Sequence, residues 1–137
     1  MPEGPIIRAI DRYGKEEVIN SDEKEFNYPM AVVANGSTAS AAELFTSALK
    51  DYKKAVIVGE TTYGKGTMQS VIPLPDGSAV CMTTAKYFPP FSDSYDEIGI
   101  VPDKEVYLSE EYANTSIYKL TYEQDIQLRT AVEAISE

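Results

Sequence analysis

Residues 30–59, MAVVANGSTASAAELFTSALKDYKKAVIVG, decide the fold of this 137-residue chain. The apolar runs at 30–34 and 55–59 are continuous rather than alternating, which is typical of strands buried in a parallel sheet. Between them, apolar residues recur at helical spacing over 40–52, and the lysines within 50–54 favour the carboxyl end of a helix. The stretch therefore predicts a right-handed βαβ unit in an α/β protein.

The flanking sequence predicts antiparallel hairpins and a final helix. Alternating apolar residues on both sides of short turns containing Gly14 and Gly77 indicate paired strands. The expected elements are hairpins at 5–19 and 67–85, with 86–88 continuing the second hairpin, a strand at 105–108 and an acidic amphipathic helix at 121–135. The length favours a single domain.

Composition argues against several classes of partner. The chain has 12 Lys and Arg against 22 Asp and Glu, a net charge of −10, and no basic cluster. Electrostatics therefore oppose binding to nucleic acid or to an anionic membrane. No apolar run approaches the roughly 18 residues of a membrane span. The first five residues lack a signal-peptide pattern and are interpreted as an internal segment.

The sequence contains no His. Ser-His and Cys-His pairs within the chain are thereby excluded, as are the commonest zinc-ligand sets. The acidic residues between Asp93 and Asp103 do not have the spacing of a calcium loop, so we predict no metal and no cofactor. Cys81 lies in an alternating run and is interpreted as a small buried hydrophobic residue.

The βαβ unit places Ser40 and the loop 60–66 at the same edge of the sheet. A helix over 40–52 carries the chain about 20 Å away at 1.5 Å per residue, and the strand at 55–59 returns it by roughly 17 Å. That edge, beyond the carboxyl ends of parallel strands, is where open α/β sheets usually place their sites.

The loop sequence GETTYGKG at 59–66 matches the phosphate-binding pattern G-x-x-x-x-G-K-[ST] except at its last position. Gly66 replaces the hydroxyl that would bind Mg²⁺, and residues 67–74 predict a strand where that loop requires a helix. We therefore reject nucleotide binding. The glycines instead let the backbone turn sharply and present Lys65 at the sheet edge.

Ser40 has two interpretations. With Glu43 it forms an S-x-x-E capping box, and the local sequence favours this structural role. The same position, beside free N–H groups at a helix N-terminus, also suits an oxyanion formed when a serine attacks a carbonyl. The loop after the second strand of the βαβ unit brings the cation Lys65 back to the neighbourhood of Ser40. The amine of Lys65 must be partly neutral to act as a base. Gln69 either orients that amine or is an exposed polar residue of the strand.

Four segments occur in the order found in a known protease family. They are NGSTASAAE at 35–43, GETTYGKGTMQ at 59–69, TTAKY at 83–87 and GIVPD at 99–103. They resemble N-G-G-S-A-S-A-S-E, G-E-x-T-F-G-K-G-x-V-Q, T-T-A-K-Y and G-I-x-P-D of the carboxyl-terminal processing, or tail-specific, proteases. The resemblance covers roughly residues 4–106.

This resemblance implies a fold related to crotonase and ClpP, and a serine endopeptidase that cleaves proteins near their C-termini with a Ser-Lys dyad. By resemblance Ser40 is the nucleophile, Lys65 the general base and Gln69 the residue that positions the lysine. The Ala41 amide is one oxyanion donor. The family's second donor belongs to an upstream glycine, for which Gly36 is the candidate substitute in this chain.

The resemblance also implies that residues 1–137 are part of a catalytic domain, without the N-terminal part of the core and without the PDZ domain. It implies an extracytoplasmic location and a protein or peptide substrate. A sheet edge left exposed predicts self-association. Two alternatives remain open: a catalytically inactive relative that binds peptides or partners, and an acyl-CoA-type ligand binder of the crotonase fold.

Overall fold

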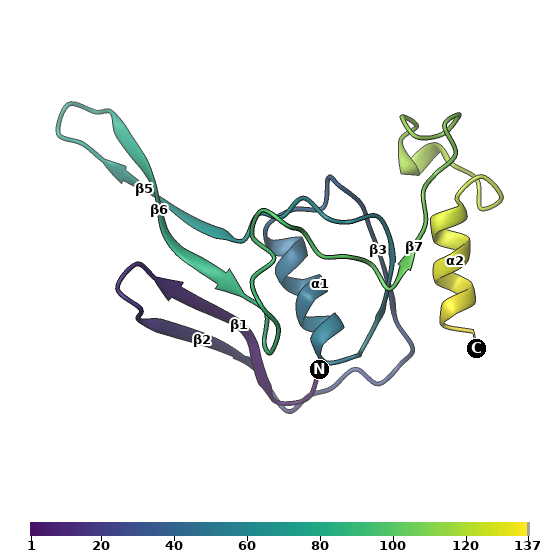
Figure 1. Cartoon of the computed structure of the whole chain (residues 1–137), viewed down its shortest axis with the longest axis horizontal. Coiled ribbons are helices and arrows are strands. Elements are labelled where there is room, and N and C mark those ends of the chain that lie inside the picture. Colours follow the sequence, from purple (N-terminus) through teal and green to yellow (C-terminus); the bar gives the residue numbers. More distant parts are fainter. Residues whose placement is uncertain (137) are drawn as a thin grey trace.

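The structure is a computed structural model in which residues 1–136 are described. Its elements are β1 (Gly4–Asp11), β2 (Glu16–Ser21), β3 (Ala31–Ala34), α1 (Ala41–Asp51), β4 (Val56–Gly59), β5 (Thr67–Pro73), β6 (Ala79–Phe88), β7 (Lys104–Glu105), a 3₁₀ turn (Ile117–Lys119) and α2 (Ile126–Ala134). They form an antiparallel sheet of order β2-β1-β6-β5 and a parallel sheet of order β3-β4-β7 (Figure 1). The α/β class, both hairpins and the C-terminal helix are confirmed, whereas kinship with crotonase and ClpP stays a prediction.

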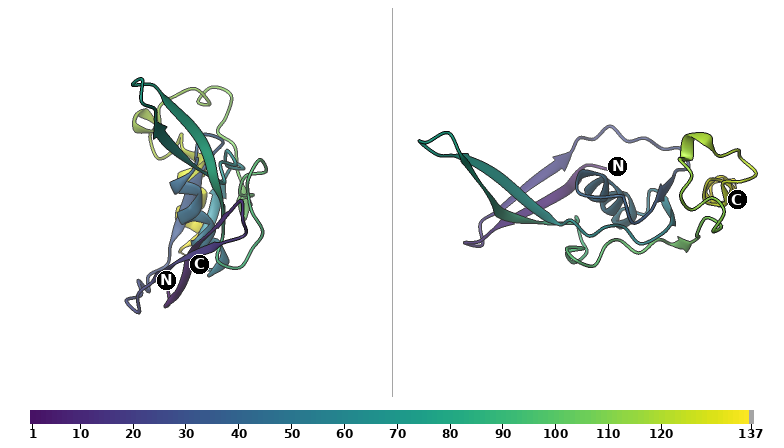
Figure 2. Two further views of the ribbon diagram at one scale, coloured as in Figure 1. Left: turned by 90° about the vertical axis from the view of Figure 1, so that its left-hand side faces the viewer. Right: turned by 90° about the horizontal axis from the view of Figure 1, so that it is seen from above.

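β3, α1 and β4 form the predicted βαβ unit, and α2 packs on the same sheet. β3 pairs with β4 in parallel, with Ala31 opposite Val56. α1 and α2 lie on either side of this sheet (Figures 1 and 2). Ile57 and Val58 are fully buried between them. The continuous apolar run of β4 follows from this arrangement, because both faces of the strand are covered.

The second hairpin projects from the body of the molecule as an arm, residues 67–85 (Figures 1 and 2). β5 and β6 pair along their length, but β1 pairs with β6 only as far as Asp11 and Ala85. Beyond that point both faces of the arm meet solvent. The prediction that Cys81 is buried is therefore wrong, since its side chain is exposed on the arm.

The C-terminal elements differ from the prediction in their limits. The helix expected from 121 begins at Ile126, because Asp125 caps it by accepting a hydrogen bond from the Leu128 N–H at 2.8 Å, and the residues before it form a turn. The strand expected at 105–108 is shorter than predicted and begins earlier in the sequence, as β7. β4 ends at Gly59 and therefore offers β7 no further residues to pair with. Neither helix among residues 1–136 is long and apolar enough to cross a bilayer.

β3 forms an edge of the parallel sheet, because within residues 1–136 it pairs only with β4. Val33 on this strand is 44% exposed. Edge strands with free main-chain groups and apolar side chains pair readily with other chains.

We expect the chain to self-associate at micromolar concentration through β3, and Val33→Lys to reduce this association because a lysine disfavours edge pairing. Light scattering measures the mass of the particles. Val71→Lys, on the arm, is the matched control and should leave the mass unchanged. A wild-type chain that stays monomeric would contradict the prediction.

Candidate active site

Ser40 occupies the sharp turn between β3 and α1. Its backbone has φ 58° and ψ −119°, a conformation that residues other than glycine rarely adopt. Such strain often marks functional positions, and a strained serine between a strand and a helix is the arrangement that exposes the hydroxyl in nucleophile elbows. The backbone at Ser40 therefore favours a chemical role over a purely structural cap.

In the capping box at Ser40, the hydrogen bond that forms is the one accepted by the Glu43 side chain. The Ser40 N–H donates to Glu43 Oε2 at 2.8 Å. The Ser40 hydroxyl faces the Glu43 amide as a capping box requires, but the contact does not meet hydrogen-bond geometry, and the hydroxyl has no other partner among residues 1–136. The oxygen that would act as a nucleophile is thus left without a hydrogen bond.

Glu43 joins the start of α1 to the loop after β4. Its side chain is fully buried and accepts four hydrogen bonds. Oε1 accepts from the Thr62 hydroxyl at 2.5 Å and the Gly64 N–H at 2.6 Å. Oε2 accepts from the N–H groups of Ser40 at 2.8 Å and Lys65 at 2.9 Å. The amide nitrogens of Ser40 and Lys65 therefore lie less than two hydrogen-bond lengths apart, as the βαβ geometry predicts.

In the part of the chain that the structure describes, Lys65 is the cation of this edge that has no acidic partner. Its side chain is half-buried and forms no ion pair among residues 1–136. Lys86, the neighbouring lysine, instead lies 3.0 Å from Asp96 Oδ2. That hydrogen bond raises the pKa of Lys86, which keeps the ammonium protonated and unsuited to act as a base.

The predicted side-chain contacts of the dyad are not formed in this structure. Within residues 1–136, Lys65 Nζ is hydrogen-bonded neither to the Ser40 hydroxyl nor to Gln69. Gln69 is exposed on β5, next to an irregularity in the pairing at Met68. Catalytic hydrogen bonds are often loose without substrate and tighten when it binds.

Of the two candidate oxyanion donors, Ala41 follows Ser40 in the sequence and Gly36 precedes it. Ala41 is the first residue of α1, and its exposed N–H has no hydrogen-bond partner among residues 1–136. Gly36 is exposed in the turn after β3, where it lines a pocket of about 350 Å³ with Asn35 and Glu60. A free amide at a helix N-terminus is suited to stabilise negative charge.

A second loop, residues 97–100, supports the loop that carries Lys65. The Thr62 hydroxyl donates to Glu43 and accepts from the Ile100 N–H at 2.7 Å. Gly64 and Gly99 have φ of 88° and 82°, and a Cβ on Gly99 would lie 2.2 Å from the Thr62 carbonyl oxygen. The two loops approach backbone to backbone, which explains why glycine is needed at both positions.

Sequence reasoning missed these roles of Glu43 and Thr62. Glu43 was assigned to the capping box alone, because its other three donors come from residues about twenty positions further along the chain. The available signal was the presence of both residues in the motif segments at 35–43 and 59–69.

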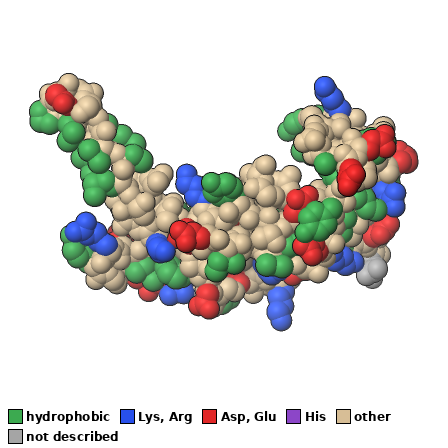
Figure 3. Space-filling view, turned by 45° about the horizontal axis from the view of Figure 1, so that its top comes forward, with side chains coloured by type: hydrophobic (Ala, Val, Ile, Leu, Met, Phe, Trp, Pro, Cys, Tyr) green, Lys and Arg blue, Asp and Glu red, His purple; other side chains and the backbone are tan. Residues whose placement is uncertain are grey.

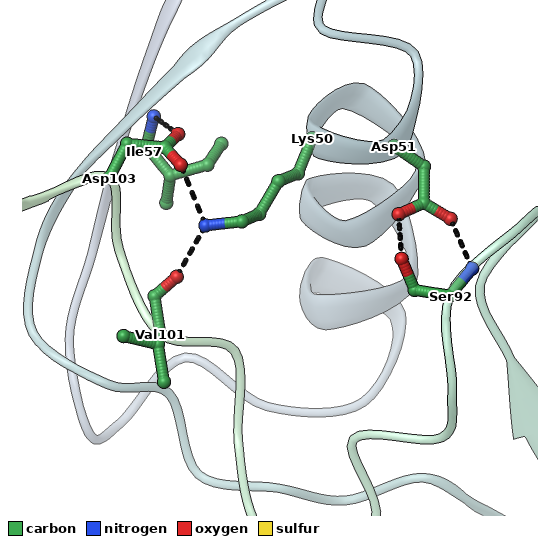
Figure 4. Close-up of polar contacts among 6 residues, drawn as sticks. All are labelled: Lys50, Asp51, Ile57, Ser92, Val101 and Asp103. Atoms are coloured by element: carbon green, nitrogen blue, oxygen red, sulfur yellow. Dashed lines mark hydrogen bonds and ion pairs between the residues drawn. The ribbon is translucent and has the colours of Figure 1, made fainter.

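Two acidic residues anchor the segment 89–103 to α1 and β4 (Figure 4). Asp103 accepts from Lys50 Nζ at 2.7 Å and from the Ile57 N–H at 2.9 Å. Asp51 accepts from the backbone and hydroxyl of Ser92. These carboxylates are thus used in holding the fold. Among residues 1–136, no three His, Cys, Asp or Glu side chains gather as a metal site.

Tyr95 adds to the electrostatics beneath the site. It is buried against Leu44 and Ile100 in the apolar cluster under α1. Burial raises the pKa of Tyr95, and the charge of Glu43 raises it further, so the phenol stays neutral. Tyr95 therefore does not add a second negative charge beside the buried carboxylate of Glu43.

The comparisons with known proteins agree on one family. Residues 1–106 match the model of peptidase family S41. A carboxyl-terminal-processing protease of Synechocystis sp. is 34% identical over 137 residues, which are 99% of this chain and 31% of that protein. The chloroplastic carboxyl-terminal-processing peptidase 2 of Arabidopsis thaliana is 40% identical over 106 residues, 75% of this chain and 21% of the relative.

Structural comparison gives the same result. The solved structure of a photosystem II D1 C-terminal processing protease matches with a TM-score of 0.73 and 36% identity, over 78% of this chain and 28% of that one. The chain spans less than a third of the length of these relatives. Because the family model covers most of the residues, the chain belongs to peptidase family S41.

Proposed function

We propose that this chain carries the dyad of a serine endopeptidase that cleaves protein substrates near their C-termini, with Ser40 as nucleophile and Lys65 as general base. Membership of the family supports peptidase function. The observation that carries the assignment of residues is the Glu43 carboxylate, whose Oε2 accepts from the amides of both Ser40 and Lys65. Within residues 1–136, no other lysine at this edge combines that position with freedom from an ion pair.

In this mechanism the neutral amine of Lys65 takes the proton of the Ser40 hydroxyl as its oxygen attacks the scissile carbonyl carbon. The Ala41 N–H donates to the oxyanion that forms. Lys65 then gives the proton to the leaving amine, and a peptide ester remains on Ser40. A water molecule, activated by the same lysine, hydrolyses the ester and restores both side chains.

Gln69 completes the dyad by accepting a hydrogen bond from the lysine when substrate is bound. It lies where the register of β5 shifts, and such irregularities re-aim side chains next to active sites. The upstream part of the core supplies the second oxyanion donor, and the complete protein adds a PDZ domain and acts outside the cytoplasm. The same proposal includes a fold related to those of crotonase and ClpP.

The test is hydrolysis of an unstructured protein with an apolar C-terminus, with the products mapped by mass spectrometry. A longer protein that includes the upstream core should cut near that terminus. Because this proposal places the second oxyanion donor upstream, the isolated 137 residues should be slower by about 10²–10³. Several turnovers per second from the isolated chain would assign the second donor to residues such as Gly36. Binding without cleavage by the longer protein would favour the inactive, peptide-binding alternative.

A further inference from the structure

The loop that carries Lys65 is held by a second carboxylate besides Glu43. Glu43 accepts from the N–H groups of Gly64 and Lys65. The next N–H along the chain, that of Gly66, donates to Asp96 Oδ1 at 3.1 Å. The two carboxylates come from distant parts of the sequence, one from α1 and the other from the segment between β6 and β7. Two acidic side chains therefore bind three successive amides around the proposed base.

The carbonyl groups on either side of Lys65 are bound as well. The Gly64 oxygen accepts from the Glu97 N–H at 2.8 Å. The Gly66 oxygen accepts from the Tyr87 N–H at 2.7 Å. Both glycines are buried, so these bonds satisfy main-chain groups that water does not reach. The backbone before and after Lys65 is thus fixed on both sides of the residue.

Asp96 packs directly against Gly66. A Cβ on Gly66 would lie 2.8 Å from the Asp96 Cβ and 3.0 Å from the Asp96 main-chain nitrogen, which is too close without a shift. Gly66 does not have a positive φ, so glycine is needed there for the close approach and not for a turn. This contact explains why the loop departs from the phosphate-binding pattern at its last position, where a serine or threonine would displace Asp96.

The charge of Asp96 is balanced by Lys86. The Asp96 side chain is only 11% exposed, and its second oxygen, Oδ2, lies 3.0 Å from Lys86 Nζ. Burying a carboxylate is costly unless it is paired and hydrogen-bonded, and here it is both. Lys86 lies on β6 opposite Thr67, and its own side chain is mostly exposed. Asp96 therefore uses one oxygen for the loop and the other for the antiparallel sheet.

Gly66 is also the junction between the loop and the arm. β5 begins one residue later, at Thr67. The arm projects from the body of the molecule, with hydrophobic side chains along it in Figure 3. Among residues 1–136, β5 pairs only with β6. The hydrogen bond at Gly66 therefore holds the loop at the point where a movement of the arm would act on it.

We propose that Asp96 is a positioning residue for the base: by holding Gly66, it keeps the Lys65 amine where it can reach the Ser40 hydroxyl when substrate binds. The inference rests on the proposed function, because it concerns the base of that mechanism. Without this hydrogen bond, Glu43 holds the amides on one side of the loop only. A displacement of about 1 Å can cost on the order of 100-fold in rate, so a small shift of the loop strongly affects turnover.

The alternative is that Asp96 only holds the fold, as Asp51 and Asp103 do. The hydrogen-bond donors of those two carboxylates lie outside the loop 60–66. The amide that binds Asp96 instead belongs to the residue next to the base. The two roles differ in what they predict, because a purely structural residue changes stability without a selective effect on kcat.

The test measures hydrolysis of an unstructured protein by the longer protein that includes the upstream core, well below the melting temperature of each variant. Asp96→Ala removes the hydrogen bond to Gly66 and should lower kcat at least about tenfold, with KM changed by less than about twofold. Asp96→Asn keeps an acceptor oxygen for the Gly66 N–H, and the exposed Lys86 side chain can turn away from the new NH₂ group. This variant should therefore retain most of the turnover. An Asn variant as impaired as the Ala variant would overturn the inference.

Gly66→Ala reaches the same contact from the other side. Its methyl group displaces Asp96 and should also lower kcat selectively, although the Asp96 side chain and its partner Lys86 are both present. This variant carries the test if Asp96→Ala does not fold. A Gly66→Ala protein with the kcat of the wild type would overturn the inference.

Ser94→Ala is the matched control in the same segment. The Ser94 hydroxyl donates to the Tyr87 carbonyl at 3.3 Å and accepts from the Asp96 N–H at 3.2 Å. Among residues 1–136 it makes no hydrogen bond to the loop 60–66. Urea denaturation reports the stability that each variant loses, and kcat of Ser94→Ala should stay within about twofold of the wild type. Equal losses of kcat in Ser94→Ala and Asp96→Ala would assign the effect to the whole segment and overturn the inference.

Amide hydrogen exchange tests the geometry without catalysis, in the Ser40→Ala form of the longer protein. Mass spectrometry follows exchange in a peptide that covers residues 60–69. Adding Asp96→Ala should speed this exchange, because the loop loses one of its holds, whereas adding Asp96→Asn or Ser94→Ala should not. Unchanged exchange with Asp96→Ala would overturn the inference, as would faster exchange combined with a wild-type kcat.

These outcomes separate the inference from the proposed function. If Ser40→Ala and Lys65→Arg abolish cleavage while Asp96→Ala has the kcat of the wild type, the dyad stands and the role of Asp96 is rejected. An active Lys65→Arg protein would instead reject the proposed base, and this inference with it, even where exchange shows that Asp96 holds the loop.

Discussion

Ser40→Ala is expected to remove nearly all peptidase activity from a protein that contains the complete catalytic core, without unfolding it. The Ser40 hydroxyl makes no hydrogen bond among residues 1–136, so its removal costs little stability, whereas no other group replaces the nucleophile. We expect a loss on the order of 10⁴-fold or more in turnover. Turnover of an unstructured protein, with circular dichroism to confirm folding, measures it.

Lys65→Arg should be nearly as harmful, because a guanidinium does not lose its proton and cannot accept one from serine. The Lys65 backbone N–H, which is the group that Glu43 binds, is unchanged in this variant. Lys86→Arg is the matched control, since an arginine keeps the ion pair with Asp96 and activity should persist. An active Lys65→Arg protein would remove Lys65 from the role of base.

Glu43→Gln is expected to lower both the free energy of unfolding and the turnover number. All four partners of Glu43 donate hydrogen bonds, two to each oxygen. Glutamine has one acceptor oxygen, so its NH₂ group takes the place of the other carboxylate oxygen and faces the two donors there. At least one buried N–H is left unpaired, at about 1–3 kcal/mol for each such group. Urea denaturation of the 137-residue chain measures the stability.

Turnover of the longer protein, measured well below the melting temperature, tests whether Glu43 positions the dyad. If its carboxylate holds Ser40 and Lys65 together, kcat falls more than KM rises. Glu23→Gln, in an exposed loop, is the control and should change stability by no more than about 0.5 kcal/mol. A Glu43→Gln chain with the stability and kcat of the wild type would show that the four hydrogen bonds do not matter.

The secondary structure could be predicted wherever it depends on local pattern. The strands at 31–34 and 56–59 and the helix between them follow from periodicity, and both hairpins follow from turn residues. Errors occurred where a tertiary partner or a cap sets the limit. β7 ends early because β4 does, and α2 begins late because Asp125 caps it.

The exposure of the arm also lay beyond sequence reasoning. Alternation in β6 predicts a half-buried strand with Cys81 inside, but the side chains of a two-stranded ribbon have no layer to pack against. Whether an alternating strand is covered depends on what lies above it, which a local pattern does not contain.

What the sequence determined by itself is the βαβ unit, the absence of histidine, and hence Ser40 and Lys65 as the pair to examine. What only the tertiary structure decided is how those residues are held. Three of the four donors around Glu43 lie there because loop 62–65 folds back onto the start of α1. A carboxylate can be buried only where donors from distant segments surround it, and that convergence is a property of the folded chain.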